Sequence, residues 1–342
     1  MAFVSHSVCC FCVAKHIFRL SELLFFIYFW LTMLLVDQSN IIYLNLFNMK
    51  KFIFFIFSII LICLNLTAQE TEIKKVEYPT GYESKIDLIY SKVNGWDGRM
   101  DVYFNPKNQN PTPIIINIHG GGWNHGTKEA QGGFNTFFKA GFAVANVEYR
   151  LVDVAKAPGA IEDIRTAMNY LIIHAKELNI DPKRIVLMGG SAGAHLALMG
   201  GLLENDRRFD TNCVGNENMK VAAIISNYAP SDFIDKTDKF YTYKSLLNWM
   251  GDKVEDVKFR ASISPVSYIS KTNPPVFIVH GNADPIVPYE QSVKLHKKLD
   301  DAGVYNEFIT VDGGKHGGFD KEKKSELSKA MMSFLKKVGV IQ

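Results

Sequence analysis

The sequence predicts an α/β fold with a mostly parallel, doubly wound sheet, helices on both faces and a small lid insertion. The first observation is a set of short, mostly apolar runs at residues 114–118, 142–147, 185–188, 222–226, 276–279 and 308–311. Such runs are typical of strands buried on both faces of a parallel sheet. The second observation is that segments with helical periodicity separate these runs. Strands that alternate with helices indicate a parallel sheet.

The predicted sheet begins with two strands of a different kind. Residues 85–90 and 100–104 alternate apolar and polar side chains. This period of two is typical of strands with one face in solvent, so we expect an antiparallel hairpin at the edge of the sheet.

Three amphipathic helices and one long insertion complete the predicted fold. Apolar stripes with helical spacing cover residues 161–175, 295–302 and 327–338, and the second helix is predicted to stop at Gly303. The aromatic-rich segment 231–270 lies between two predicted core strands. A long segment in that place is either a functional loop or lid, or ordinary surface packing.

The beginning of the chain has the layout of a secretory signal peptide. Lys50 and Lys51 precede an apolar run over residues 52–64, and the small residue Ala68 stands at the expected cleavage point. The run is shorter than the roughly 20 residues that a membrane-spanning helix needs. A membrane anchor and lipid attachment at Cys63 are the alternatives.

These features predict how the chain is divided and where it acts. We expect residues 1–48 to be an over-extended reading frame upstream of the true start at Met49. Residues 49–68 are then the signal peptide, and residues 69–342 are a single catalytic domain. The protein is accordingly expected to be secreted or periplasmic, with no stable membrane partner after cleavage.

Charge and cysteine content exclude several classes of protein. The 342 residues include 38 basic and 35 acidic side chains, a balance that does not suggest nucleic-acid binding. Beyond residue 68 the only cysteine is Cys213, so we expect neither an internal disulfide nor a cysteine zinc site there. Asp, Glu and His do not cluster at metal-ligand spacing, and we expect no metal or cofactor.

A serine stands in a glycine-rich turn between a strand and a helix. The run GGSAG around Ser191 follows the predicted strand 185–188 and precedes an apolar helical stretch, 194–203. In this setting G-x-S-x-G is typical of a nucleophilic serine, because a sharp turn exposes the hydroxyl above the sheet. The helix N-terminus behind it favours a developing anion. The alternative is an inert serine in a glycine-rich turn.

A second glycine-rich run follows the strand 114–118. The run HGGGW begins at His119, and its glycines leave backbone N–H groups uncovered. We expect the N–H groups of Gly121, Gly122 and Ala192 to form an oxyanion hole. Phosphate binding is the alternative, but neither G-x-G-x-x-G nor G-K-[ST] occurs here. His119 is expected to be a turn residue, and Trp123 to line the acyl pocket or to pack beneath the loop.

A nucleophilic serine needs a base and a carboxylate that orients the base. Asp284 follows the predicted strand 276–279, and His316 lies in a glycine-rich loop after the last strand. Both therefore belong to the same sheet edge as Ser191, in the chain order Ser, Asp, His. Asp232 is the alternative acid.

Other polar residues have structural interpretations. His195, one helical turn after Ser191, is expected to be buried packing rather than a second base. Asp163 is expected to support a loop or helix end by hydrogen bonding. His125 and His174 are expected on the surface.

Taken together, four motifs resemble those of a known superfamily. HGGGW, GGSAG, HGNADPIVP and GGKHGGF occur in this order over about residues 80–340. This part of the chain resembles the α/β-hydrolase superfamily, in particular esterases related to hormone-sensitive lipases and to bacterial feruloyl and acetyl-xylan esterases. The resemblance implies Ser191 as nucleophile, His316 as base and Asp284 as the residue that orients it. Gly190 stands where many lipase relatives carry an acidic residue, which favours the acetyl or feruloyl esterase branch.

The resemblance predicts a serine carboxylester hydrolase that works through an acyl-enzyme. Its expected substrates are small esters or acylated carbohydrates, such as acetylated or feruloylated plant polysaccharide. The alternatives are an arylformamidase or a peptidase of the same fold, and a non-catalytic binding protein. Arylformamidases are mostly cytosolic, peptidases of this fold usually carry a further large domain, and binding proteins commonly lose the serine or the histidine. The sequence leaves the oligomeric state open.

Overall fold

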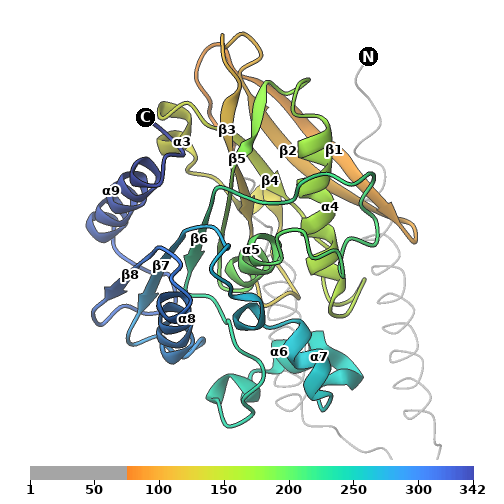
Figure 1. The fold of residues 1–342 in the computed structure, drawn as a ribbon, viewed down its shortest axis with the longest axis vertical. Coiled ribbons are helices and arrows are strands. Elements are labelled where there is room, and N and C mark those ends of the chain that lie inside the picture. Colours follow the sequence, from red (N-terminus) through yellow and green to blue (C-terminus); the bar gives the residue numbers. More distant parts are fainter. Residues whose placement is uncertain (1–74) are drawn as a thin grey trace, which may run out of the picture. The chain divides into compact units, whose positions relative to one another are not determined.

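The described residues form a sheet of eight strands in the order β1-β2-β4-β3-β5-β6-β7-β8 (Figure 1). The computed structural model describes residues 75–342, so the predicted reading-frame extension and signal peptide lie outside the described residues. The strands are β1 (Glu83–Val93), β2 (Trp96–Phe104), β3 (Thr112–Ile118), β4 (Ala143–Val147), β5 (Ile180–Gly190), β6 (Ala223–Asn227), β7 (Val276–Gly281) and β8 (Asn306–Val311). β2 is antiparallel to β1 and β4, and all later pairs are parallel. The predicted fold class is confirmed.

The edge hairpin is longer than its alternating pattern predicts. A two-residue turn, Asn94 and Gly95, joins the strands, and both residues have positive φ, 49° and 82°. Turns of this kind match the right-handed twist of the flanking strands. Register shifts interrupt the pairing of β1 with β2, as is common at sheet edges.

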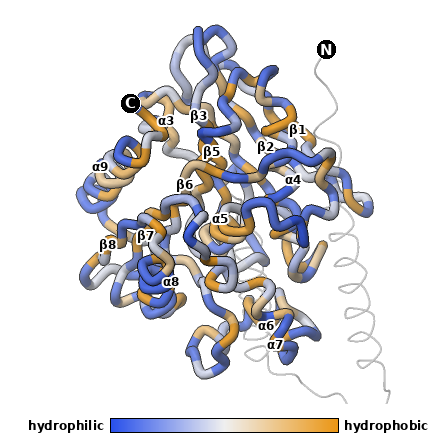
Figure 2. The backbone as a smooth tube through the Cα atoms, in the orientation of Figure 1, coloured by the Kyte–Doolittle hydropathy of each residue, from blue (hydrophilic) through white to orange (hydrophobic). Residues whose placement is uncertain are grey.

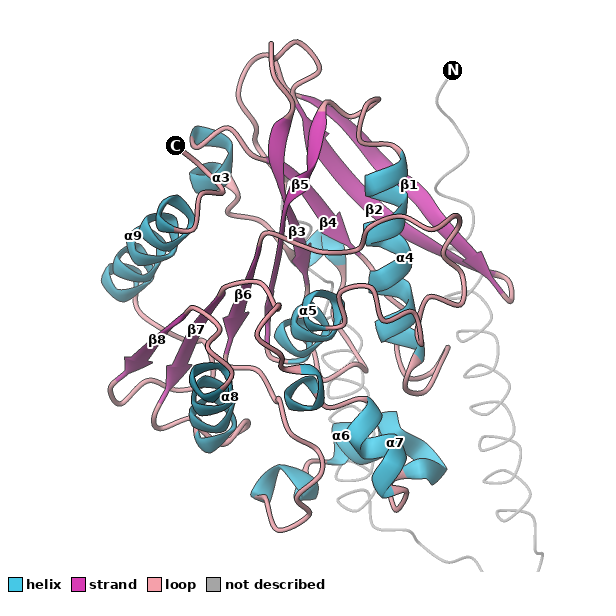
Figure 3. Cartoon of the chain, in the orientation of Figure 1, coloured by secondary structure: helices cyan, strands magenta, loops and turns pink. Residues whose placement is uncertain are grey.

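Helices cover the two faces of the sheet (Figure 3). They are α3 (Asn135–Lys139), α4 (Gly159–Ile173), α5 (Ala192–Leu202), α6 (Lys244–Met250), α7 (Val257–Ser262), α8 (Glu290–Asp301) and α9 (Lys321–Lys337). Four short 3₁₀ segments accompany them, at Lys128–Ala130, Lys239–Thr242, Gly251–Lys253 and Pro265–Tyr268.

Successive residues of β3 belong to different cores, because side chains of a strand alternate between faces. Ile114 and Ile116 share a buried cluster with residues of α4, α5 and α8, whereas Ile115 joins residues of α3 and α9. Every residue of α5 is buried, so this helix is apolar all round, in contrast to the mixed surface of α8 and α9 (Figure 2). The sheet therefore has a filled core on each face, and α5 lies within one of them.

The insertion over residues 231–270 packs largely into the protein. Its buried side chains Phe233, Phe240, Leu246 and Trp249 belong to the same cluster as α4 and α5. Among the residues that the structure describes, no helix is long and apolar enough to cross a membrane.

A buried lysine fastens the segment after β3 to the edge hairpin. The Lys128 side chain is almost fully buried, and its Nζ lies 2.9 Å from carboxylate oxygens of Asp87 in β1 and Asp101 in β2. Glu129 is a third carboxylate partner, at 2.6 Å. Burial opposes a charge at Lys128, but these carboxylates outweigh it and raise the pKa of the lysine. Asn146 of β4 also donates a hydrogen bond to the Lys128 carbonyl.

Candidate active site

The serine singled out by the sequence lies in a sharp turn between β5 and α5. Ser191 has φ 57° and ψ −124°, outside the regions that side chains favour. Close packing leaves no room for a side chain two residues before or two residues after Ser191. A Cβ on Gly189 would lie 2.3 Å from the backbone carbon of Gly193, and one on Gly193 would lie 2.2 Å from the carbonyl oxygen of Ile118. The glycines of GGSAG therefore let the turn touch the end of β3.

The glycine loop after β3 faces the same cavity as Ser191. Gly121 and Gly122 have φ of 111° and 55°, and a Cβ on Gly121 would lie 2.0 Å from the carbonyl oxygen of His125. Within the described residues the N–H groups of these two glycines donate no backbone hydrogen bond. Ala192 is the first residue of α5, at the helix N-terminus. These positions are compatible with the predicted oxyanion hole, whose donors remain a prediction.

The predicted acid and base are hydrogen-bonded. Nδ1 of His316 lies 2.7 Å from Oδ2 of Asp284, whose side chain is fully buried. The other carboxylate oxygen accepts the backbone N–H groups of Ile286 and Val287, at 2.8 Å and 3.0 Å. Burial by itself would raise the pKa of Asp284, but hydrogen bonds from two histidines and from Ile286 hold it well below its usual range.

The structure separates the two candidate acids. Asp232 accepts the N–H of Ile234 and lies 3.9 Å from Nζ of Lys294, and it has no hydrogen bond to His316. Of the two candidate acids, only Asp284 is therefore hydrogen-bonded to His316.

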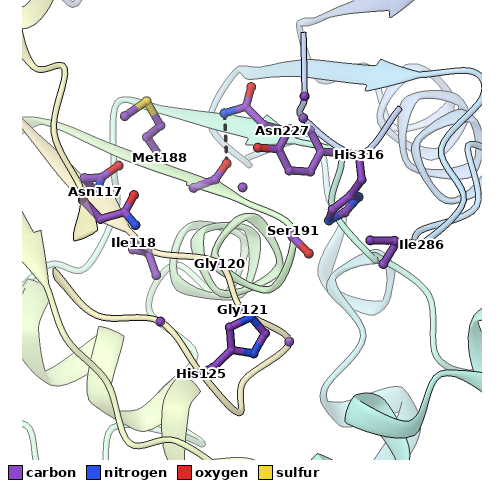
Figure 4. A pocket seen from close by; sticks show the side chains of 18 of the residues that line it. Asn117, Ile118, Gly120, Gly121, His125, Met188, Ser191, Asn227, Ile286 and His316 are labelled. Carbon is purple, nitrogen blue, oxygen red and sulfur yellow. Dashed lines mark hydrogen bonds between the residues drawn. The ribbon is translucent and has the colours of Figure 1, made fainter. Parts of the chain in front are cut away.

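Ser191 and His316 share one cavity of about 690 Å³. In Figure 4 the Ser191 side chain lies between the glycine loop and His316, with Ile286 beyond. Polar amides of Asn117, Gln131 and Asn227 also line this cavity. The structure thus brings a strained serine, a carboxylate-bound histidine and a glycine loop to one cavity, the arrangement needed for nucleophilic attack on a carbonyl group.

Several residues at this site were missed by sequence reasoning. Tyr228 follows β6 at the same sheet edge, and its ring packs against His316 with centroids 4.7 Å apart. Tyr243, from the insertion, and Ile286 line the cavity. His280 contacts Asp284. The position of Tyr228 directly after a buried strand was a usable signal, whereas nothing in the sequence pattern aims Tyr243 at the cavity.

The expectation that Trp123 contacts substrate is wrong for this cavity. Trp123 is buried beneath the glycine loop and is not among the residues that line the cavity. Its ring stacks on Trp249 of the insertion at 4.4 Å and meets the edge of His195 at 5.3 Å. The physical reason is the backbone: φ of Trp123 is 60°, and this turn directs the side chain into the core.

The other predicted histidines divide into buried and exposed ones. His195 is fully buried and donates from Nε2 to the Ile263 carbonyl at 2.9 Å, and burial lowers its pKa to about 4. His119 is also buried, donates to the carbonyl of Gly120, and burial lowers its pKa to about 4. The packing role expected for His195 is confirmed.

The remaining polar predictions have clear places. His174 lies at the surface beside Glu177, as expected, and its ring is partly covered by Tyr170. His125 is exposed too, but it also lines the cavity. Asp163 accepts hydrogen bonds from the backbone N–H and Nε of Arg150, as expected for a residue that supports a loop.

The described residues contain no group of three or more His, Cys, Asp or Glu side chains placed to hold a metal ion. Cys213 is free and partly buried.

Comparison with known proteins places this geometry among esterases. A family model described as BD-FAE matches residues 100–299, more than half of the chain. The match includes Ser191 and Asp284 and ends before His316.

Two curated relatives come from Mycobacterium tuberculosis. Esterase LipC is 26% identical over 197 residues, which cover 55% of this chain and 48% of LipC. Carboxylesterase NlhH is 26% identical over 234 residues, covering 66% of this chain and 70% of NlhH. The chain spans about half the length of LipC and of several other curated relatives.

A solved structure extends the likeness. The truncated form of a carbohydrate esterase from gut microbiota is 27% identical, with a TM-score of 0.67. The match covers 77% of this chain and 99% of that one.

Proposed function

The chain belongs to the BD-FAE family, and from this premise we propose that it is a secreted serine carboxylester hydrolase. The observation that carries the proposal is the pairing of His316 with the buried carboxylate of Asp284 at the cavity that also contains Ser191. The serine lies in a strained turn that suits a nucleophile elbow.

The geometry supports a two-step mechanism. His316 takes the proton of Ser191 as the hydroxyl oxygen attacks the ester carbonyl. The resulting oxyanion is stabilised by N–H groups of Gly121, Gly122 and Ala192. His316 then protonates the departing alcohol, and water cleaves the acyl-enzyme by the same route. Asp284 holds the Nδ1–H tautomer of His316, which leaves Nε2 free to accept the serine proton.

The proposed substrates are acylated carbohydrates or short acyl and aromatic esters. The carbohydrate esterase relative supports the first class. The cavity wall supports it as well, because its polar residues Asn117, Gln131 and Asn227 suit hydroxyl groups better than a long alkyl chain. The amide nitrogens of Asn117 and Asn227 already donate to Asn146 and Gly189, so these two residues offer their amide oxygens as acceptors. At about 690 Å³ the cavity exceeds what a single acetyl group fills, which leaves space for part of a sugar or an aromatic ring.

The decisive experiment compares Ser191→Ala with Ser325→Ala, which changes an exposed serine on α9. Acetate release from acetylated xylan, methyl ferulate hydrolysis and turnover of p-nitrophenyl esters of rising chain length would be measured. We expect Ser191→Ala to lower kcat at least about 10⁴-fold with the fold intact, and Ser325→Ala to change nothing. An active Ser191→Ala protein would refute the proposal. Serine-dependent turnover of amides but not esters would favour the amide hydrolase alternative.

Secretion is tested separately. Sequencing the amino terminus of protein purified from its native source should find Gln69 as the first residue. A peptide from residues 1–48 in its mass spectrum would contradict both the cleavage and the proposed start at Met49.

A further inference from the structure

A second histidine contacts the triad acid from within the fold. His280 lies at the end of β7, four residues before Asp284, and its side chain is fully buried. Its Nε2 is 3.1 Å from Oδ2 of Asp284 and 3.1 Å from the carbonyl oxygen of Val287. Its Nδ1 is 2.7 Å from the hydroxyl of Ser292, in the first turn of α8. His280 therefore joins the loop that carries Asp284 to the strand before it and the helix after it.

The partners of His280 determine where its proton lies. A carboxylate and a carbonyl group can only accept hydrogen bonds, so Nε2 must carry the hydrogen and share it between Asp284 and Val287. Nδ1 faces a hydroxyl, which can donate. With the hydrogen on Nε2, every polar atom of the ring has a partner.

With His280, the carboxylate of Asp284 has a full set of donors. Oδ1 accepts the backbone N–H groups of Ile286 and Val287, and Oδ2 accepts His280 and His316. A carboxylate held by two donors on each oxygen cannot rotate without losing hydrogen bonds in a buried site, where an unmade bond is costly.

The buried histidines His119 and His195 do not show this arrangement. One ring nitrogen of His119 (Nε2) and one of His195 (Nδ1) have no hydrogen-bond partner in the described part of the chain. His280 has partners on both nitrogens and still cannot reach substrate, because it is fully buried and does not line the cavity with Ser191. Its only route to the chemistry is through Asp284.

We propose that His280 is a positioning residue of the triad: by donating from Nε2 to Oδ2 it fixes the rotamer of Asp284, and through it the orientation of His316. His316 depends on such support because it stands in a loop of glycines between Gly313 and Gly318. The hydrogen-bonded chain then runs from Ser292 through His280 and Asp284 to His316, which lines the same cavity as Ser191. This inference rests on the proposed function.

Two substitutions at position 280 separate positioning from packing. A Gln amide nitrogen reaches about where Nε2 of histidine lies, and an Asn amide reaches about where Nδ1 lies. We expect His280→Asn to lower kcat for p-nitrophenyl acetate by about 10- to 100-fold with KM within about twofold. His280→Gln, which restores the donor, should recover kcat to within about threefold of the parent. The control is His174→Asn, a surface change that should leave both constants unaltered.

Three results would overturn the inference: an unchanged kcat in His280→Asn, equal losses in the Asn and Gln variants, or a loss confined to KM. Ser191→Ala distinguishes this failure from failure of the proposed function. If Ser191→Ala is inactive while His280→Asn is as active as the parent, the esterase proposal stands and the role of His280 falls. If Ser191→Ala is active, the proposed function itself fails.

A gentler variant covers the case in which His280→Asn does not fold. Ser292→Ala leaves the ring in place but removes the donor to Nδ1, so the tautomer that deprives Asp284 of its hydrogen bond becomes accessible. We expect kcat to fall several-fold, and the ¹H NMR signal of the His316 Nδ1 proton to move from its downfield position. An unchanged kcat together with an unchanged Nδ1 proton signal would overturn the proposal.

Discussion

The part of the cavity around Ser191 and the part around Asp284 are held in place by different forces. Around Ser191 the backbone itself is in contact, since a Cβ on Gly193 would lie 2.2 Å from the Ile118 carbonyl oxygen. Beneath the glycine loop lies a layer of packed aromatic rings that includes Trp123 and Trp249. Around Asp284, by contrast, four hydrogen bonds fix the side chain.

The comparison teaches that substitutions around Ser191 and substitutions around Asp284 should impair the protein in different ways. Steric contacts between backbones are part of the folded core, so disturbing them should cost stability. Hydrogen bonds that orient a carboxylate determine the geometry of proton transfer, so disturbing them should cost rate while most of the packing remains. Substitutions on each side can test this division.

The largest effect is expected from Gly193→Ala. The new methyl group would meet the carbonyl oxygens of Ile118 and His119, which are backbone atoms and cannot move aside. We expect a loss of more than about 4 kcal/mol in the free energy of unfolding, measured by urea denaturation, or no folded protein at all. Gly318→Ala is the control, because nothing lies within 4 Å of its new Cβ. Equal stability of the two variants would contradict the steric account.

Asp284→Asn should act mainly on rate. The amide cannot accept as the carboxylate does, so the tautomer and orientation of His316 are lost while the side-chain volume is kept. We expect kcat to fall by about 10⁴-fold. Asp301→Asn, an exposed change at the end of α8, should leave kcat unaltered. A loss of activity explained entirely by unfolding of Asp284→Asn would show that both halves fail alike.

The stability contributed by His195, near Ser191, and that contributed by Asp284 should be lost in different ranges of pH. The pKa of His195 is about 4 in the folded protein, below the ordinary value of 6.5, so the unfolded chain binds more protons between these values. Stability is therefore lost as pH falls from 6.5 to 4, by up to about 3 kcal/mol for this residue. The pKa of Asp284 is lowered from 3.8, so its contribution is lost only below that pH.

The measurement for this prediction is a series of urea denaturations between pH 7 and pH 3. His119 adds to the same slope, whereas Asp163, whose pKa burial raises to about 6, opposes it. The difference between the parent and His195→Gln isolates one histidine, since Gln keeps a donor for the Ile263 carbonyl. Identical pH slopes of the two proteins would contradict the prediction.

The smallest effect is expected from Trp249→Phe. The indole nitrogen of Trp249 has no hydrogen-bond partner in the described part of the chain, so the change removes ring area but no hydrogen bond. We expect a loss of about 1–2 kcal/mol in stability and no change in kcat. A kcat reduced out of proportion to stability would mean that the aromatic layer also shapes the site.

The sequence was sufficient for the sheet and for most of the candidate site because both follow from local patterns. Ser191 and Asp284 follow the largely buried strands β5 and β7, His316 follows the half-exposed edge strand β8, and the carboxyl ends of parallel strands meet at one edge. The hairpin over β1 and β2 was visible as alternation, although its ends were not.

What the sequence did not reveal depends on single dihedral angles and on distant partners. The side chain of Trp123 points into the core because its φ is 60°, and no composition or period encodes that value. Its partner, Trp249, comes from the insertion more than a hundred residues later. The contact of His280 with Asp284 depends on how the loop between them turns. The letters of the motif HGNADP do not predict that conformation.

The buried ion pairs of Lys128 couple local opening of the glycine loop to local opening of the edge hairpin, β1 and β2. Because Lys128 joins the segment after β3 to Asp87 and Asp101, opening that segment exposes charges that the hairpin must then release as well. The hairpin and the segment should therefore open as one cooperative unit. Amide hydrogens of β2 and of residues 121–130 would then exchange with solvent in the same opening event, although β2 does not line the cavity.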